Sequence, residues 1–288
     1  MIILNRYDSV KKAGILGIFG NIFLLIIKTI VAFLSHSQAM IADAANSAGD
    51  IFASLMTFIG NKISSEPYDK THNFGHGKAE YIFSLFISIS MVFASVKLLY
   101  DSVLSLVHQE AFIFSWFLVI VCIITIAVKL ALYLYTKAMS KKYDNILLEA
   151  NMKDHRNDCI VTLCTLISIL FGAFGFYLFD GIVGIGISIW IAYTGISILV
   201  ESCNILMDIS IDNDTEKMIL DLAHSYKDIK KVDPISSAPV GYQYIVVLTI
   251  YVDGSISTFD SHNLADSLEN DITKLDKVYR TIIHVNPI

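Results

Sequence analysis

Six long apolar runs constrain the fold of this chain more than any other feature of its sequence. Each run is about 20 residues long, the length that an α-helix needs to cross a hydrocarbon core of about 30 Å. Hydrophobic residues make up 55% of the 288 residues and charged residues only 17%, which is too apolar for a soluble domain of this size. We therefore expect an integral membrane protein with six transmembrane helices, at residues 13–34, 39–61, 79–101, 113–136, 147–172 and 179–203.

The chain changes character at residue 212, where the apolar runs shorten and charged residues return. We divide it into a transmembrane transport domain, residues 1–211, and a C-terminal domain, residues 212–288. The tail pattern predicts a helix at 215–227, an extended piece at 229–235, a strand at 244–252, a helix at 261–274 and a strand at 278–285, with a turn at 239–241. This order is compatible with a ferredoxin-like α+β domain.

Lysine and arginine residues set the predicted orientation, because short loops rich in these residues favour the cytoplasmic side. The first, third and fifth loops, at about 35–38, 102–112 and 173–178, contain none. We therefore expect a protein of the plasma (inner) membrane with both termini in the cytoplasm. The tail has seven basic and twelve acidic residues, a balance that argues against a nucleic-acid partner. Basic residues instead precede the first span and flank the second and fourth loops: Arg6, Lys11, Lys12, Lys62, Lys70, Lys78, Lys137, Lys141 and Lys142.

Two polar pairs lie inside predicted spans, Asn46 with Asp50 and Asp154 with Asp158. A charged side chain at bilayer depth costs roughly 2.5 to 3.5 kcal/mol on insertion scales, which makes such residues functional candidates. Residues four apart share a helix face, so the two pairs can form one compact site for a divalent cation. Protons would replace the cation when it leaves, which couples metal movement to proton movement. The alternative is that these groups only form hydrogen bonds between helices.

The ligand type constrains the cation. Carboxylate and amide oxygens without imidazole or thiolate suit Mn²⁺, Mg²⁺ or Ca²⁺ better than zinc or copper. Asp43 lies about one turn from the first pair and is predicted to line an outward exit path. Asn21, in the first span, either supports the site or bonds between helices. Three lysines in the apolar spans are expected to extend their ammonium groups toward a membrane interface: Lys28, Lys97 and Lys129.

Residues 66–80 read E-P-Y-D-K-T-H-N-F-G-H-G-K-A-E and closely resemble the cytoplasmic loop and following helix start of the cation diffusion facilitator family. Residues 43–50 and 154–158 resemble the membrane motifs of that family in place and spacing. The resemblance covers nearly the whole chain. It implies a divalent-cation exporter that works as a homodimer, by alternating access and in exchange for protons, without enzymatic activity or a cofactor.

The resemblance also implies residue roles. Asn46, Asp50, Asp154 and Asp158 would be the transport site. Zinc-type members carry His where this chain has Asp154, so the chain looks like the manganese branch. Efflux of Zn²⁺, Fe²⁺, Co²⁺ or Cd²⁺ remains an alternative.

Two further metal sites and one ion pair follow from the same resemblance. A loop site maps onto Asp69, His72 and His76, with a solvated loop of inactive histidines as the alternative. A weak C-terminal site maps onto Asp233, His262 and His284. Lys78 and Asp208 match an interlock between the third and sixth spans.

A membrane-bound metal sensor or scaffold without net transport is the main competing function. A channel is disfavoured because tight coordination slows the release of an ion. An enzyme is not expected, since the sequence offers no nucleophile and base pair or phosphate-binding glycine loop at suitable spacing.

Overall fold

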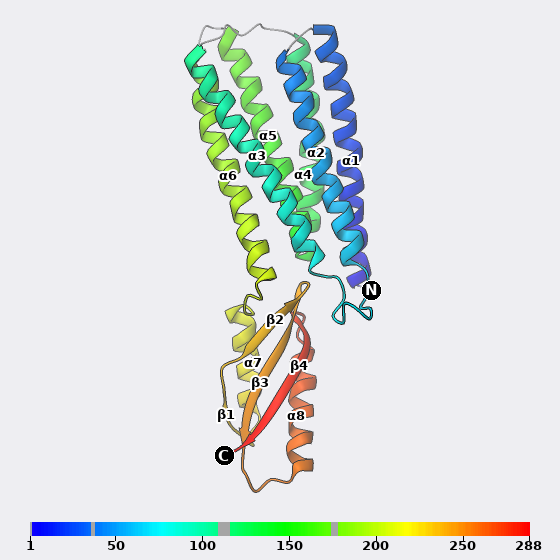
Figure 1. Ribbon diagram of the computed structural model, residues 1–288, viewed down its shortest axis with the longest axis vertical. Coiled ribbons are helices and arrows are strands. Elements are labelled where there is room, and N and C mark those ends of the chain that lie inside the picture. Colours follow the sequence, from blue (N-terminus) through cyan, green and yellow to red (C-terminus); the bar gives the residue numbers. More distant parts are fainter. Residues whose placement is uncertain (1, 36–37, 109–115, 174–177) are drawn as a thin grey trace. The chain divides into compact units, whose positions relative to one another are not determined.

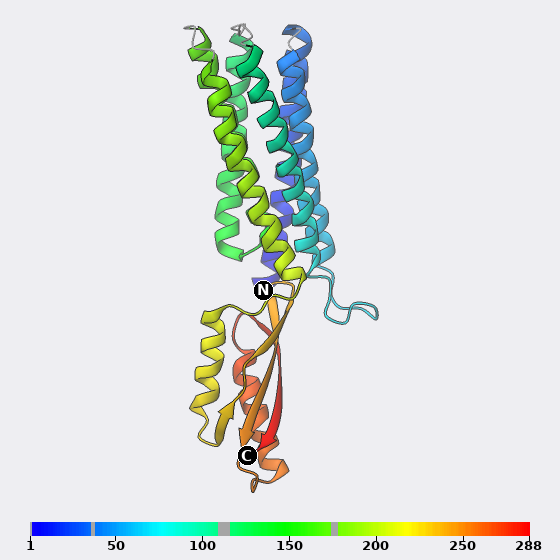
Figure 2. The same cartoon turned by 60° about the vertical axis from the view of Figure 1, so that its left-hand side comes forward.

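A computed structural model describes residues 2–35, 38–108, 116–173 and 178–288. The chain forms two compact units, each with its own internal contacts. The first holds Met1–Ser65 and Ala79–Cys203, and the second holds Glu66–Lys78 and Asn204–Ile288. Figures 1 and 2 show the helices of the first unit in blue to yellow-green and the strands of the second in yellow to red.

The described residues of the first unit form a bundle of six long helices, which Figure 1 shows side by side. They are α1 Ile2–Ser35, α2 Gln38–Ser64, α3 Ala79–His108, α4 Trp116–Tyr143, α5 Ile146–Ala173 and α6 Leu178–Leu206, the last of which ends in the second unit. Helix α1 begins well before the predicted span. The side chains of Arg6 and Val10 are buried, 4% and 0% exposed, which gives this charged first part of the helix a packed face.

Within the described residues, four of the helices are long and apolar enough to cross a membrane. They cover Arg6–Leu34, Ala79–Val107, Trp116–Tyr143 and Gly181–Leu206. The other two long helices, α2 and α5, carry the polar pairs that the sequence singled out. Each of these helices is less apolar because of those side chains.

Glycines let α1 and α2 pack closely. A Cβ atom added at Gly14 would lie 3.1 Å from Phe58, and one at Gly17 would lie 2.6 Å from the Ser54 hydroxyl oxygen. Close packing of this kind through small residues is typical of helix pairs in membranes.

The second unit combines two helices with one sheet. Its elements are α7 Asn213–Ser225, β1 Ile229–Val232, β2 Ser236–Val240, β3 Gln243–Val252, α8 Thr258–Thr273 and β4 Val278–Pro287. Strand β3 is central: β1 and β2 pair with it antiparallel and β4 pairs with it parallel. The sequence did not predict β2 as a separate strand, because the run that we interpreted as a turn, from Pro239, lies mostly inside it.

Alternation along β3 defines the core of the second unit. Val246, Leu248 and Ile250 are fully buried and share one hydrophobic cluster with Ile219 of α7 and Leu268 of α8. The intervening residues of β3 face the other side of the sheet. The two helices therefore cover one face of the sheet.

Candidate functional site

One cavity in the helical unit collects the membrane residues that the sequence singled out. Its volume is about 210 Å³. All four residues of the predicted transport site contribute to its wall, although they come from two helices about 100 residues apart in sequence. The lining includes Asn46, Asp50, Asp154, Asp158, Asp43, Lys28, Lys97, Asp101, Thr125, Lys129 and Asn157.

Lys129 of α4 lies inside this cluster, and the prediction that it reaches toward an interface was wrong. Its side chain is only 1% exposed, and its ammonium nitrogen lies 2.7 Å from Asp50 Oδ2 and 2.5 Å from Asp158 Oδ2. A buried lysine is tolerated only where opposite charges compensate its desolvation. Lys129 thus joins carboxylates from α2 and α5.

Lys28 of α1 forms a second buried ion pair on the cavity wall. Its ammonium donates to Asp43 Oδ1 at 2.9 Å, and its side chain is 3% exposed. The prediction that Lys28 extends to an interface was therefore also wrong. Asp43, predicted to line an exit path, does line the cavity and carries this ion pair.

Asp154 is the least satisfied carboxylate of the cluster. Among the described residues, its buried Oδ2 atom has no hydrogen-bond partner. The ring of its neighbour His155 is fully buried, and neither ring nitrogen has a partner in the described part of the chain. Ligand atoms of Asp154, His155 and Asp158 lie within 4.8 Å of one another. The imidazole of His155 therefore lies close to these two carboxylates, although His155 is not one of the residues that line the cavity.

Asn21 of α1 fixes the backbone beneath Asp50. Its amide nitrogen donates to the Asp50 carbonyl oxygen at 3.0 Å and to the Ser54 hydroxyl at 3.1 Å. These contacts join α1 to α2. Asn21 therefore both bonds between helices and supports the position of Asp50.

A stripe of buried polar residues continues along α2 from the cavity toward the end of the helix. Its members recur every three or four residues, so they share one helix face, and each is at most 8% exposed. Thr57 accepts a hydrogen bond from Asn151 of α5 at 3.2 Å. We call these residues the α2 stripe: Ser47, Asp50, Ser54, Thr57, Asn61 and Ser64.

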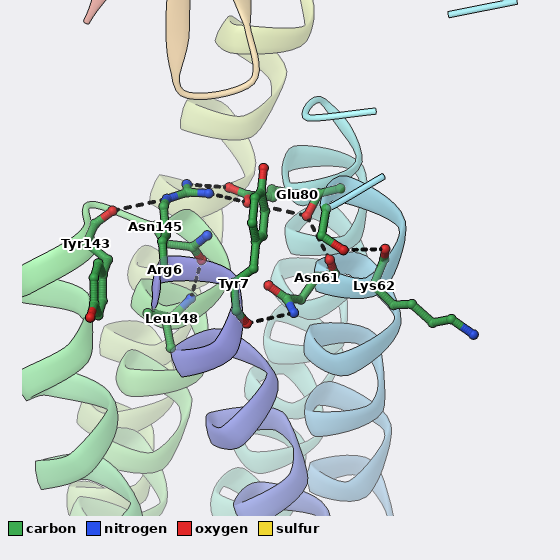
Figure 3. A network of polar contacts seen from close by, with 10 residues as sticks. Arg6, Tyr7, Asn61, Lys62, Glu80, Tyr143, Asn145 and Leu148 are labelled. Carbon is green, nitrogen blue, oxygen red and sulfur yellow. Dashed lines mark hydrogen bonds and ion pairs between the residues drawn. The ribbon is translucent and has the colours of Figure 1, made fainter. Parts of the chain in front are cut away.

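A buried ion pair lies at the end of this stripe (Figure 3). The Arg6 guanidinium donates to both carboxylate oxygens of Glu80, at 2.6 and 2.7 Å, and its Nε donates to the Tyr143 carbonyl oxygen at 3.2 Å. The Ser64 hydroxyl donates to Glu80 at 3.4 Å. The start of α1 is thus joined to α3 and to the end of α4, and the Ser64 bond joins α2 to α3.

The loop before α3 gathers the second predicted group. Asp69 Oδ1 lies 3.4 Å from His72 Nδ1, Asp69 Oδ2 lies 3.7 Å from His76 Nε2, and the two rings are 4.3 Å apart. His76 Nδ1 donates to the Pro67 carbonyl oxygen at 3.2 Å, which leaves Nε2 directed at Asp69. Hydrogen bonds from the His72 backbone and the Thr71 hydroxyl hold the pKa of Asp69 well below its usual range. All three side chains can supply metal ligands.

The structure explains why glycine occupies both positions of the F-G-H-G-K motif. Gly75 has φ of +78°, a conformation that glycine adopts at little cost. A Cβ at Gly77 would lie 2.8 Å from the Cα of Gly241, itself at φ of +63° in the turn between β2 and β3. The motif thus packs backbone against backbone within the second unit.

The lysine of the same motif pairs with Asp208, as the resemblance predicted, at 2.7 Å. Asp208 has φ of +60°, and the Ile209 N–H donates to the Asn204 carbonyl oxygen across it. This is the position where helices most often carry glycine. A carboxylate is therefore held in a conformation that is unfavourable for aspartate, where it contacts Lys78.

The structure does not bring the three predicted C-terminal ligands together. Within the described ranges, Asp233, His262 and His284 do not form a group with ligand atoms inside 4.8 Å. Asp233 instead pairs with Lys231 at 2.8 Å and accepts from Tyr251 at 3.0 Å, and these bonds lower its pKa. Both histidines are exposed.

Comparison with known proteins identifies the chain. Residues 14–207 match the pattern of the cation efflux transmembrane domain, and residues 211–288 match the cytoplasmic domain of cation efflux proteins. The chain belongs to the cation efflux family. The resemblance to cation diffusion facilitators is thereby confirmed, and the protein is a membrane-embedded cation efflux transporter.

Relatives of this cation efflux protein match almost end to end. An uncharacterized transporter, MJ0449 of Methanocaldococcus jannaschii, is 29% identical over 96% of this chain and 98% of its own length. The magnetosome protein MamB of Magnetospira is 28% identical, covering 94% and 92%. The manganese efflux system protein MneP of Bacillus subtilis is 26% identical, covering 98% and 97%.

Sequence reasoning missed several members of the cavity wall. Lys129 carried a signal, since a lysine inside an apolar span requires a partner, but its partners lie 79 and 29 residues away. Thr125 and Asn157 also line the cavity. Their identities alone carry no comparable signal, because neutral polar residues are common in membrane helices.

Proposed function

We propose that this cation efflux protein exports Mn²⁺, with Asn46, Asp50, Asp154 and Asp158 as the cation ligands. The observation that carries the proposal is that all four side chains line one cavity inside the helical unit. Three carboxylates and an amide oxygen match the ligand preference of a hard divalent cation. The buried, unpartnered Asp154 oxygen, noted above among the described residues, is free to coordinate.

The preference for manganese has two supports. The first is the oxygen-rich donor set, and the second is the similarity to a protein named for manganese efflux. The buried His155 ring beside the carboxylates adds a nitrogen donor, which would also suit zinc. Efflux of Zn²⁺, Fe²⁺, Co²⁺ or Cd²⁺ is therefore the alternative that a competition assay must address.

We further propose six transmembrane spans, with α2 and α5 stabilised by their neighbours, and both termini in the cytoplasm. The cavity residues of α2 and of α4 lie in the first half of each helix. In this orientation the cavity opens outward. The α2 stripe would line the route that opens inward, and its unpartnered atoms would then be hydrated. Alternation between these two states, in exchange for protons, would move the cation.

For the rest of the chain we propose a cytoplasmic domain, residues 212–288, of ferredoxin-like type. The face of its sheet that α7 and α8 leave uncovered includes Val247 and Ile282, 39% and 45% exposed. An exposed apolar face of this kind favours a homodimer. We assign an auxiliary metal site to Asp69, His72 and His76, and keep the weak site at Asp233, His262 and His284 as a proposal that would need rearrangement.

Flux into sealed vesicles tests the proposed function. Purified protein in vesicles with a pH gradient should accumulate Mn²⁺, and Asp50→Ala or Asp154→Ala should abolish the accumulation. Asp221→Ala, an exposed carboxylate on α7, is the matched control and should transport normally. Binding of Mn²⁺ without flux would favour a sensor, and normal flux in both cavity variants would refute the assigned ligands.

A further inference from the structure

The position of Lys129 has a consequence beyond the ligand set. Its ammonium lies between Oδ2 of Asp50 and Oδ2 of Asp158, two of the oxygens that the proposed function assigns to the transported cation. The side chain is only 1% exposed, so its ammonium group contacts these carboxylates and not bulk water. A cation cannot coordinate both oxygens while the ammonium holds them.

The charges of the cluster have a simple balance. Asp50, Asp154 and Asp158 carry three negative charges, and Lys129 returns one positive charge. The remaining two negative charges equal the charge of one divalent cation. With Lys129 retained, binding of such a cation leaves the cluster neutral in a surrounding of low polarity, where uncompensated charge is costly.

The cavity provides alternative contacts for a displaced ammonium. Thr125 lies one turn from Lys129 on the same face of α4, and its buried hydroxyl has no partner among the described residues. The lysine stem is flexible, with four carbons between backbone and charge. A modest rotation of the stem would release Asp50 and Asp158 without removing the positive charge from the cavity.

Lys28 and Asp43 form a second ion pair between a lysine and a carboxylate of the cavity wall. Asp43, Asp50 and Asp158 on the cavity wall thus each contact a lysine from another helix. Ion pairs that served only to join helices would not need to use the oxygens that face the cavity. In both pairs, a lysine ammonium lies where a cation in the cavity would contact the carboxylates.

We propose that Lys129 is a tethered counter-cation: it occupies the place of the transported divalent cation when none is bound, and it competes with that cation for Asp50 and Asp158. The proposal rests on the proposed function, because it requires the cation to bind at these carboxylates. Competition weakens equilibrium binding and thereby speeds release, so Lys129 is a positioning residue that sets affinity and turnover.

The test is Mn²⁺ binding to the purified full-length protein, measured at constant pH from the loss of the electron paramagnetic resonance signal of free Mn²⁺. Lys129→Met removes the charge with little change of shape and should lower the Kd at least tenfold. Lys129→Arg keeps the charge and should bind as weakly as the native protein or more weakly. Lys137→Met is the matched control, since Lys137 lies on the same helix and contacts Tyr133, and should leave the Kd unchanged.

Transport supplies a second readout that a merely structural lysine would not give. Lys129→Met should lower KM and kcat together, because a tighter site fills at lower Mn²⁺ and empties more slowly. An unchanged or weaker Mn²⁺ affinity in Lys129→Met would overturn the proposal. If the variant folds poorly, Lys129→Gln is measured as well, and added Mn²⁺ should restore folding of either variant; failure of Mn²⁺ to do so would make Lys129 purely structural.

The two proposals fail in different ways. If the native protein neither binds nor moves Mn²⁺, or Asp154→Ala binds it normally, the proposed transport site is wrong. If the native protein binds and moves Mn²⁺ and Asp154→Ala does not, but Lys129→Met keeps the native affinity, only the counter-cation is wrong.

Discussion

The ion pair between Arg6 and Glu80 allows a quantitative prediction about the stability of the helical unit. Both side chains are almost fully enclosed, 5% and 2% exposed, and two parallel hydrogen bonds of 2.6 and 2.7 Å join them. Charges about 4 Å apart attract by about 4 kcal/mol at an effective dielectric constant of about 20. This attraction offsets the desolvation of both groups only while both are present.

Removal of one partner should therefore cost more than removal of both. Arg6→Met or Glu80→Gln alone should lower the free energy of unfolding by about 3 to 5 kcal/mol, because the remaining charge stays buried without compensation. The double variant Arg6→Met/Glu80→Gln should cost much less than the sum of the two single changes. Lys62→Met, an exposed lysine near the pair, is the control and should stay within about 0.5 kcal/mol of the native protein.

The measurement is a double-mutant cycle on protein in mixed micelles, with helix unfolding followed as the denaturing detergent is increased. A coupling free energy above about 2 kcal/mol is expected, which is near the upper range for residues in contact. If the two single losses simply add in the double variant, the guanidinium and the carboxylate act independently. That result would refute the interpretation of the pair as one compensated unit.

Three shorter predictions concern other parts of the chain. Asp208→Gly should leave stability nearly unchanged, because relief of the left-handed backbone offsets a surface pair worth about 0 to 1 kcal/mol; vesicle flux should nevertheless fall, and normal flux would remove any role for the Lys78 pair in transport. Burial alone would raise the pKa of Asp212, but hydrogen bonds from Lys277 and Thr215 lower it to about 2. Asp212→Ala should cost about 1 kcal/mol at neutral pH as a lost helix cap. Because its folded pKa lies below its unfolded value, this contribution is complete above about pH 4 and disappears as the pH falls toward 2, which urea unfolding at several pH values would reveal. Asp154→His should raise Zn²⁺ flux relative to Mn²⁺ at least tenfold in competition, and an unchanged ratio would show that residue 154 does not select the metal.

The helices were predictable because their signal is local. Span length, loop charge and the Asp212 cap all lie within about 20 residues of the element that they define. The errors arose where tertiary contacts decide. The start of α1 has a charged sequence that does not look like part of a span. Its helix is stabilised by the ion pair of Arg6 with Glu80, 74 residues away. Strand β2 is only five residues long and contains a proline, so no periodicity could distinguish it from a turn.

The candidate site was likewise predictable only where its signal is local. A four-residue spacing places two ligands on one helix face, and two such pairs suffice to predict a cluster. The same rule has no information about a third helix. Lys129 comes from α4, and its role depends on how α2, α4 and α5 pack. Spacing can therefore predict which residues meet in a membrane cavity, but not the lysine from a third helix that contacts them.

Comparison of the two buried ion-pair systems indicates why one is structural and the other functional. At Arg6 and Glu80, all three guanidinium nitrogens donate and both carboxylate oxygens accept, so every polar atom of the pair has a partner. Around Lys129, by contrast, Asp154 Oδ2 lacks a partner among the described residues, and a cavity reaches the cluster. A satisfied network fixes one arrangement, whereas an incompletely satisfied one is costly until a ligand completes it. A divalent cation would complete the second system and has no place in the first. One buried pair thus joins the helices, and the proposed function would make the other the place where the cation exchanges.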